Sequence, residues 1–157
     1  MKNCFMMFTD GIVLGHHISR NRIRVDTSKV EFIYKLSIPT CQRDVRSFLG
    51  FTGYYRRFVE NFTKIASRLF KLLTKDCGFN WNSDCQNAFE SLKEKTFEAP
   101  ILRGPNWKLP FHISTDASDT TLGAVLGQKD LTPYSIYYTS KNLTHAELNY
   151  TVTEKEF

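Results

Sequence analysis

The chain has 157 residues, of which 21 are Lys or Arg and 16 are Asp or Glu, giving a formal net charge of +5. This length and the 41% hydrophobic content predict one folded unit of domain size. No apolar run approaches the roughly 20 residues that a bilayer crossing needs, and the first residues lack the apolar stretch of a signal peptide. We expect an intracellular protein, in the cytoplasm or the nucleus, that does not enter a membrane.

The charge is distributed unevenly along the chain. Residues 1–81 hold 14 Lys and Arg against 6 Asp and Glu, whereas residues 82–157 hold 7 against 10. A basic half with interleaved aromatic residues favours a surface for a polyanion, and an acidic half can supply carboxylates for a metal or for acid–base work. The alternative is two solvated surfaces that simply differ in charge.

The cysteines do not indicate a metal site or a disulfide framework. They are Cys4, Cys41, Cys77 and Cys85, and none forms a C-x-x-C pair or lies at ligand spacing with a histidine. Without a secretory signal they are expected to be reduced thiols.

The first predicted elements are a β-hairpin and a short helix. Two apolar segments, residues 4–8 and 12–18, flank Thr9-Asp10-Gly11, and Asp-Gly is a strong hairpin turn signal. Asp26 then provides N-cap chemistry for a helix over residues 29–36, which Pro39 ends.

A longer helix is predicted from Gln42 to about Asn61. One face carries a stripe at helical spacing, expected to be buried: Val45, Phe48, Leu49, Thr52, Tyr55 and Val59.

The other face of this helix places Arg46, Gly50, Gly53 and Arg57 on one continuous ridge. Two missing side chains between two guanidinium groups let a phosphate backbone approach closely. The alternative is that the glycines permit contact with another helix and the arginines are ordinary surface charge.

Two more helices are predicted before a connection. One covers residues 64–73, and the other runs from Ser83 to about Lys95, opened by a capping box of the S-x-x-Q type. Residues 99–105 contain two prolines and a glycine, which marks a boundary between modules.

After this boundary the period of the apolar residues becomes that of strands. Residues 109–114, 121–127 and 135–139 predict a three-stranded antiparallel meander. A second capping box, Thr151 to Glu154, starts a helix at about Val152 that the chain end cuts off.

Asp116 is the leading candidate for a metal ligand. It follows a predicted strand and is flanked by small residues that leave space for a divalent cation. A lone acid in this position is more often a turn residue that caps a backbone amide. A second acid, Glu154 or Glu156, can meet Asp116 if the last helix packs against the meander.

Six motifs in this order resemble the Pol polyprotein of Ty3/gypsy-type LTR retrotransposons. They are Leu14-Gly15-His16, the run from Val45 to Phe58, Ala99–Leu102, Thr115–Ser118, Gly123–Gln128 and Asn149–Glu156. The resemblance covers essentially the whole chain.

The resemblance implies an α+β fold in two parts. Residues 1–98 correspond to the end of reverse transcriptase, with a primer-grip hairpin followed by thumb and connection helices. Residues 99–157 correspond to the first half of an RNase H-like domain, an incomplete fold of a three-stranded meander and a truncated helix. The nucleic-acid-binding residues that it implies are Leu14, Gly15, His16, Arg46, Arg56 and Arg57.

The resemblance also implies chemistry on an RNA:DNA hybrid or a template-primer duplex. Asp116 and Glu156 correspond to the first two RNase H carboxylates, which hold Mg²⁺ or Mn²⁺ together with aspartates beyond Phe157. No Tyr-x-Asp-Asp motif of the polymerase occurs in the sequence. We therefore expect this chain alone neither to polymerise DNA nor to cut RNA at a useful rate, its other partner being the rest of the Pol polyprotein.

Two alternatives stay open at this point. One is a non-catalytic basic module that binds nucleic acid. The other is a retroelement relic that does not fold, since half a sheet leaves an open edge. Departures from the family pattern, such as Arg22 in place of a turn glycine, suggest drift.

Overall fold

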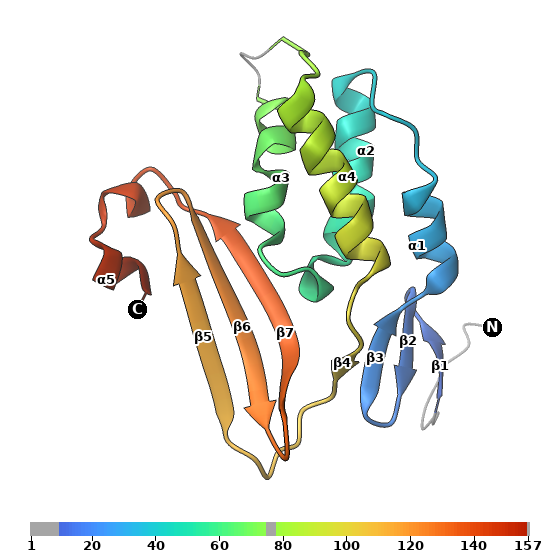
Figure 1. Cartoon of the computed structure of the whole chain (residues 1–157), viewed down its shortest axis with the longest axis vertical. Helices are drawn as coiled ribbons and strands as arrows, with labels where there is room; N and C mark the ends of the chain where they lie inside the picture. The colour runs from blue at the N-terminus through green and yellow to red at the C-terminus, as the bar shows by residue number, and fades with distance from the viewer. Residues whose placement is uncertain (1–9, 75–77, 157) are drawn as a thin grey trace, which may run out of the picture.

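The computed structural model describes residues 10–74 and 78–156, except for the side chains of Val152 and Glu156. The fold is α+β, as predicted, with two antiparallel sheets and a layer of helices (Figure 1). The elements are β1 (Asp10–Val13), β2 (His16–Ser19), β3 (Arg22–Val25), α1 (Thr27–Tyr34), α2 (Gln42–Tyr54), the 3-10 turn η1 (Arg56–Phe58), α3 (Phe62–Lys71), α4 (Ser83–Phe97), β4 (Leu102–Arg103), β5 (Phe111–Ala117), β6 (Thr121–Lys129), β7 (Pro133–Asn142), η2 (Glu147–Asn149) and α5 (Val152–Glu156).

The N-terminal hairpin forms, but its predicted turn is wrong. Asp10 and Gly11 are paired inside β1 with Ser19 and Ile18 of β2, and the chain reverses at Leu14-Gly15 instead. A two-residue hairpin loop of type I′ needs positive φ at both central residues, and the tip has φ values of 48° and 71°. The predicted strand over residues 4–8 lies outside the described residues.

The predicted boundary segment contributes a strand that the sequence did not indicate. Leu102 pairs with Ile23 of β3, which makes β4 the fourth strand of the first sheet, in the order β1-β2-β3-β4. Leu102 is buried, and its pairing with Ile23 holds the connecting segment against the helices. The two parts of the chain are thus joined by a strand rather than by a free linker.

Side-chain caps set the first residues of α1 and α4. Asp26 caps α1 by accepting a hydrogen bond from the Ser28 amide, as predicted. The predicted cap of α4 is displaced by one residue, because Asn82 accepts from the Cys85 amide at 3.0 Å. Gln86 therefore does not close a box with Ser83 and instead accepts from the Trp81 indole.

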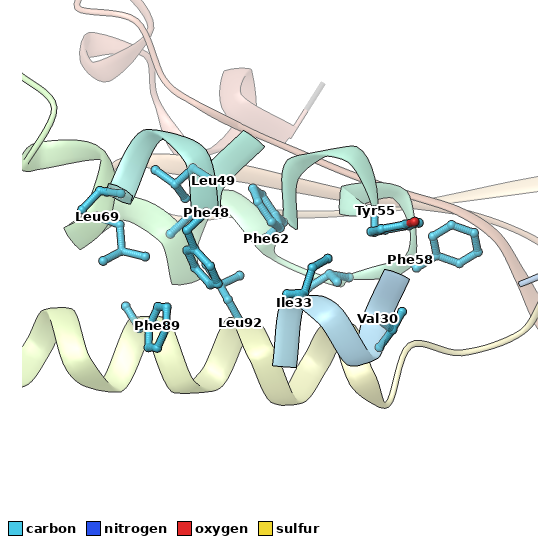
Figure 2. Packing of buried hydrophobic residues seen from close by; sticks show 14 of the residues in the cluster. Val30, Ile33, Phe48, Leu49, Tyr55, Phe58, Phe62, Leu69, Phe89 and Leu92 are labelled. Carbon is cyan, nitrogen blue, oxygen red and sulfur yellow. The ribbon is translucent and has the colours of Figure 1, made fainter. Parts of the chain in front are cut away.

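The buried core lies between α1, α2, α3 and α4 (Figure 2). Every residue of the predicted stripe is buried, although the helix ends at Tyr54 and Tyr55 and Val59 lie beyond it. Phe48 meets Phe89 of α4 with ring centroids 4.5 Å apart. Leu69 of α3 and Leu92 of α4 are fully buried at the centre of this packing.

The second sheet is the predicted meander, in the order β5-β6-β7. It adds no residue to the buried apolar cluster, and β5 is an edge strand on which Ile113 is 72% exposed. It is fastened by polar contacts: Thr63 of α3 bonds to Ser140 of β7, and the buried Gln128 side chain bonds to the Asn106 backbone.

Within the described ranges, no helix is long and apolar enough to cross a membrane. The helices are amphipathic, with one face in the core described above.

The two candidate caps of α4, Asn82 and Ser83, give a direct test of where this helix begins. Asn82→Ala removes the acceptor for the Cys85 amide and is expected to lower the free energy of unfolding by about 1 kcal/mol. Ser83→Ala is expected to leave it nearly unchanged, because the Ser83 hydroxyl makes no hydrogen bond among the described residues. Urea unfolding measures both, and a larger loss for Ser83→Ala would contradict the assignment.

Candidate functional site

The Leu14-Gly15 turn is held in a fixed position against the end of α2. The hydroxyl of Tyr54 donates to the Leu14 carbonyl, and that of Tyr55 donates to the Gly15 carbonyl at 3.3 Å. The Leu14 backbone is in the left-handed region, and its side chain is 83% exposed. A rigid turn therefore presents an apolar side chain to the surroundings.

His16 fills the space between this turn and the helix. Its ring stacks on Phe58 with centroids 5.6 Å apart and lies within 6 Å of the rings of Tyr54 and Tyr55. Its Nδ1 donates to the Leu14 carbonyl at 3.0 Å. Burial, assisted by the nearby Arg57 charge, lowers the pKa of His16 below its ordinary value, although the Leu14 hydrogen bond opposes this.

A groove of about 370 Å³ separates the turn from α1 and α2. Its lining residues are Leu14, Gly15, Lys29, Ile33, Gly50, Phe51, Tyr54 and Tyr55. A Cβ atom built at Gly50 or Gly53 meets no atom of the described residues within 4 Å. The glycines therefore do not serve contact with another helix, and this face of α2 is open to a ligand.

Two of the three candidate arginines lie on the surface. Arg46 of α2 and Arg56 of η1 are exposed, and neither forms an ion pair with an acid among the described residues. They are free to reach an external anion beside the groove.

The prediction of one continuous ridge from Arg46 to Arg57 is wrong. The α-helix ends at Tyr54, and Arg57 belongs to η1. Its half-buried guanidinium lies 5.1 Å from the ring centroid of Tyr137 in β7, a cation–π contact that turns it toward the second sheet. Contact with a residue 80 positions later could not be read from helical spacing.

Asp116 is exposed in β5, one residue before the strand ends. A hollow of about 110 Å³ beside it is also lined by Glu60 and Asn61, from the segment between η1 and α3. Ser118, rather than Asp116, caps the turn that follows, by accepting from the Thr121 amide. The alternative of an ordinary turn cap therefore does not apply to Asp116.

The last helix lies beside β5, as the candidate acid pair requires (Figure 1). Glu154 accepts from both the backbone and the hydroxyl of Thr151, the predicted capping box, and these bonds lower its pKa. The carboxylate of Glu154 is therefore already engaged in hydrogen bonds at the start of α5. The side chain of Glu156 lies outside the described residues.

Metal binding rests on the chemistry of the donors. Carboxylate and amide oxygens are the ligands that Mg²⁺ and Mn²⁺ take in proteins, so Asp116 and its surroundings suit such an ion. Among the side chains that the structure describes, no group of three His, Cys, Asp or Glu residues comes together to hold one.

Comparison with known proteins identifies the relatives. A family model described as the RNase H-like domain found in reverse transcriptase matches residues 81–157. The Pol polyprotein of transposon 297 from Drosophila melanogaster is 36% identical over 157 residues, 99% of this chain. This chain belongs to the family of retrotransposon Pol polyproteins. The Pol polyprotein of the Drosophila transposon 412 and a Tf2 transposon polyprotein of Schizosaccharomyces pombe are each 32% identical, over 99% and 91% of this Pol chain.

The Pol chain spans only a small part of these relatives: 14%, 13% and 11% of their respective lengths. Its fold is similar to a part of the foamy viral protease-reverse transcriptase. The complex of that protein with dsDNA matches with a TM-score of 0.78 and 24% identity, over 94% of this chain and 31% of the other. The complex with an RNA/DNA hybrid matches with a TM-score of 0.78 and 23% identity, over 94% and 20%.

Sequence reasoning missed the residues that fix the turn. Tyr55 was assigned to the core stripe and Tyr54 to no role, yet both bind backbone carbonyls 40 residues earlier in the chain. Lys29 and Phe51 of the groove were likewise not singled out. Their only signal in the sequence is that they are large side chains on the exposed sides of two predicted helices.

The partly buried His16 makes the stability of the turn depend on pH. Because its pKa is lowered in the folded state, the unfolded chain binds a proton more readily below about pH 6.5. The free energy of unfolding should therefore fall as the pH drops from about 7 toward the folded pKa. His16→Phe keeps an aromatic ring and should flatten this part of the profile, whereas the exposed His145→Gln control should not. A wild-type slope retained in His16→Phe would contradict this account.

Proposed function

We propose that this chain is the part of a Ty3/gypsy-type reverse transcriptase and RNase H that holds an RNA:DNA hybrid or a template-primer duplex. The open groove between the Leu14-Gly15 turn and the glycine face of α2 supports this proposal most strongly. Arg46 lies about one helical turn before the groove residue Gly50, and Arg56 directly follows the groove residue Tyr55. Neither arginine has an acidic partner in the described part of the chain. A rigid turn, a face without side chains and free guanidinium groups together suit a phosphate backbone.

In this proposal the residues have different roles. Leu14 and Gly15 contact the primer end of the duplex, while Arg46 and Arg56 neutralise phosphates along it. His16 and Arg57 act from behind the surface, since their side chains pack on Phe58 and Tyr137. They position the turn and the second sheet rather than bind the duplex directly.

We further propose that Asp116 and Glu156 are two carboxylates of an RNase H site that takes Mg²⁺ or Mn²⁺. Such ions activate the attacking water and stabilise the leaving oxygen of the RNA strand. Two acids hold a pair of ions poorly, so this chain alone does not cut RNA at a useful rate. It does not polymerise DNA alone either, because no Tyr-x-Asp-Asp motif occurs in its sequence. Cleavage of a hybrid by the purified chain that requires both Mg²⁺ and Asp116 would contradict this.

The proposal divides the chain at residue 98 and gives it an intracellular location. Residues 1–98 form the duplex-holding part and residues 99–157 the first half of an RNase H-like domain, completed by the remainder of Pol. The family model that matches residues 81–157 begins within the first of these two parts. A non-catalytic binding module is the second candidate, because it requires only the groove and the arginines.

The duplex-holding role is tested by charge-neutral variants at the groove. Arg46→Gln with Arg56→Gln removes two proposed phosphate contacts and should flatten the dependence of log K on log salt for a short RNA:DNA hybrid by about 1.8. The affinity at low salt should fall more than tenfold. Fluorescence anisotropy between about 50 and 200 mM salt measures both quantities.

Lys35→Gln with Lys71→Gln provides the matched control. Both lysines are exposed, at the ends of α1 and α3, and their removal changes the net charge equally. An equal loss of affinity in the control, or a flat salt response of the wild type, would exclude a specific phosphate surface at the groove.

A further inference from the structure

The outer face of the first sheet carries a row of arginines that the proposed function does not use. Arg22 and Arg24 are two residues apart on β3, so they project from the same face. Arg103 of β4 is the direct cross-strand partner of Arg22. All three are exposed, whereas Val25 and Leu102, on the opposite face, are buried in the core.

The positive charge of this row is not neutralised within the described part of the chain. None of the three arginines forms an ion pair with an acid there. The nearby Asp10 carboxylate lies 3.3 Å from Nδ1 of His17 and pairs with that ring instead. Like charges directly opposite one another weaken a sheet, so Arg22 and Arg103 destabilise the bare protein. An external anion would relieve this repulsion.

The row is shaped to receive such an anion. A hollow of about 170 Å³ runs beside Arg22 and Arg24, and its other lining residues are Asp10, His17, Ser19 and Ile101. The guanidinium carbon of Arg103 lies 4.1 Å from the ring centroid of Tyr134, which limits its motion. The planar fork of each guanidinium matches a phosphate group.

We propose that Arg22, Arg24 and Arg103 bind the phosphate backbone of a single nucleic-acid strand. Arg22 and Arg24 follow one another along β3, and Arg103 lies beside Arg22 on β4. A short row of this kind offers contacts to one backbone, whereas a duplex presents two. Arg24 pairs with His17 and Arg22 with Ser19 of β2, so the row runs along β3 away from the Leu14-Gly15 turn.

The test compares two arginine variants of the full chain. Arg22→Gln with Arg24→Gln leaves the Arg103–Tyr134 contact in place. For a labelled single strand of about 16 nucleotides, its salt slope should flatten by about 1.4 and its affinity should fall roughly tenfold or more at about 100 mM salt. For a blunt RNA:DNA hybrid of about the same length, the affinity should change less than threefold.

Lys35→Gln with Lys71→Gln is again the control for net charge, and urea unfolding verifies that each variant is folded. The proposal is overturned if Arg22→Gln with Arg24→Gln leaves the single-strand affinity unchanged, or if the control loses as much of that affinity. Either result would leave the row available to an acidic protein segment instead. Arg46→Gln with Arg56→Gln separates this inference from the proposed function. If the duplex does not bind in the groove, Arg46→Gln with Arg56→Gln leaves the affinity for the hybrid unchanged. If no strand binds the arginine row, Arg22→Gln with Arg24→Gln leaves the affinity for the single strand unchanged.

Discussion

The packing of the His16 ring against Tyr54, Tyr55 and Phe58 fixes the position of the hairpin turn, and the geometry of the groove depends on it. Both tyrosine hydroxyls also bind the turn carbonyls, so a backbone with positive φ at Leu14 is held in one conformation. Strain of this kind persists only where the surroundings determine the conformation several times over. The Leu14 side chain is therefore held in a fixed position relative to the open face of α2.

The same cluster connects the hairpin to the second sheet. Phe58 contacts His16 on one side, and its neighbour Arg57 packs on Tyr137 of β7. Thr63 adds hydrogen bonds to Ser140 on the same strand. Because the second sheet has little buried apolar surface, these contacts determine where it lies. The groove and Asp116 are therefore parts of one arrangement rather than features of independent modules.

Local patterns predicted most of the fold, and contacts between distant residues explain where they failed. The helical period was sufficient for the buried stripe of α2, since one face of a helix must enter the core. Asp10-Gly11 carried the strongest turn signal, yet the pairing of β1 with β2 moved the turn to Leu14-Gly15. The candidate site divides in the same way. Local reasoning proposed the glycine face and Asp116, whereas it could not predict that Arg57 packs on Tyr137.

The central claim, that duplex nucleic acid lies in the groove between the hairpin turn and α2, is tested most directly by NMR titration of the labelled chain with an RNA:DNA hybrid. The account predicts that the backbone signals of Leu14, Gly15, Gly50 and Gly53 shift first and together, since these residues line or flank the groove. Shifts confined to the second sheet, or none at all at concentrations where the hybrid binds, would contradict it.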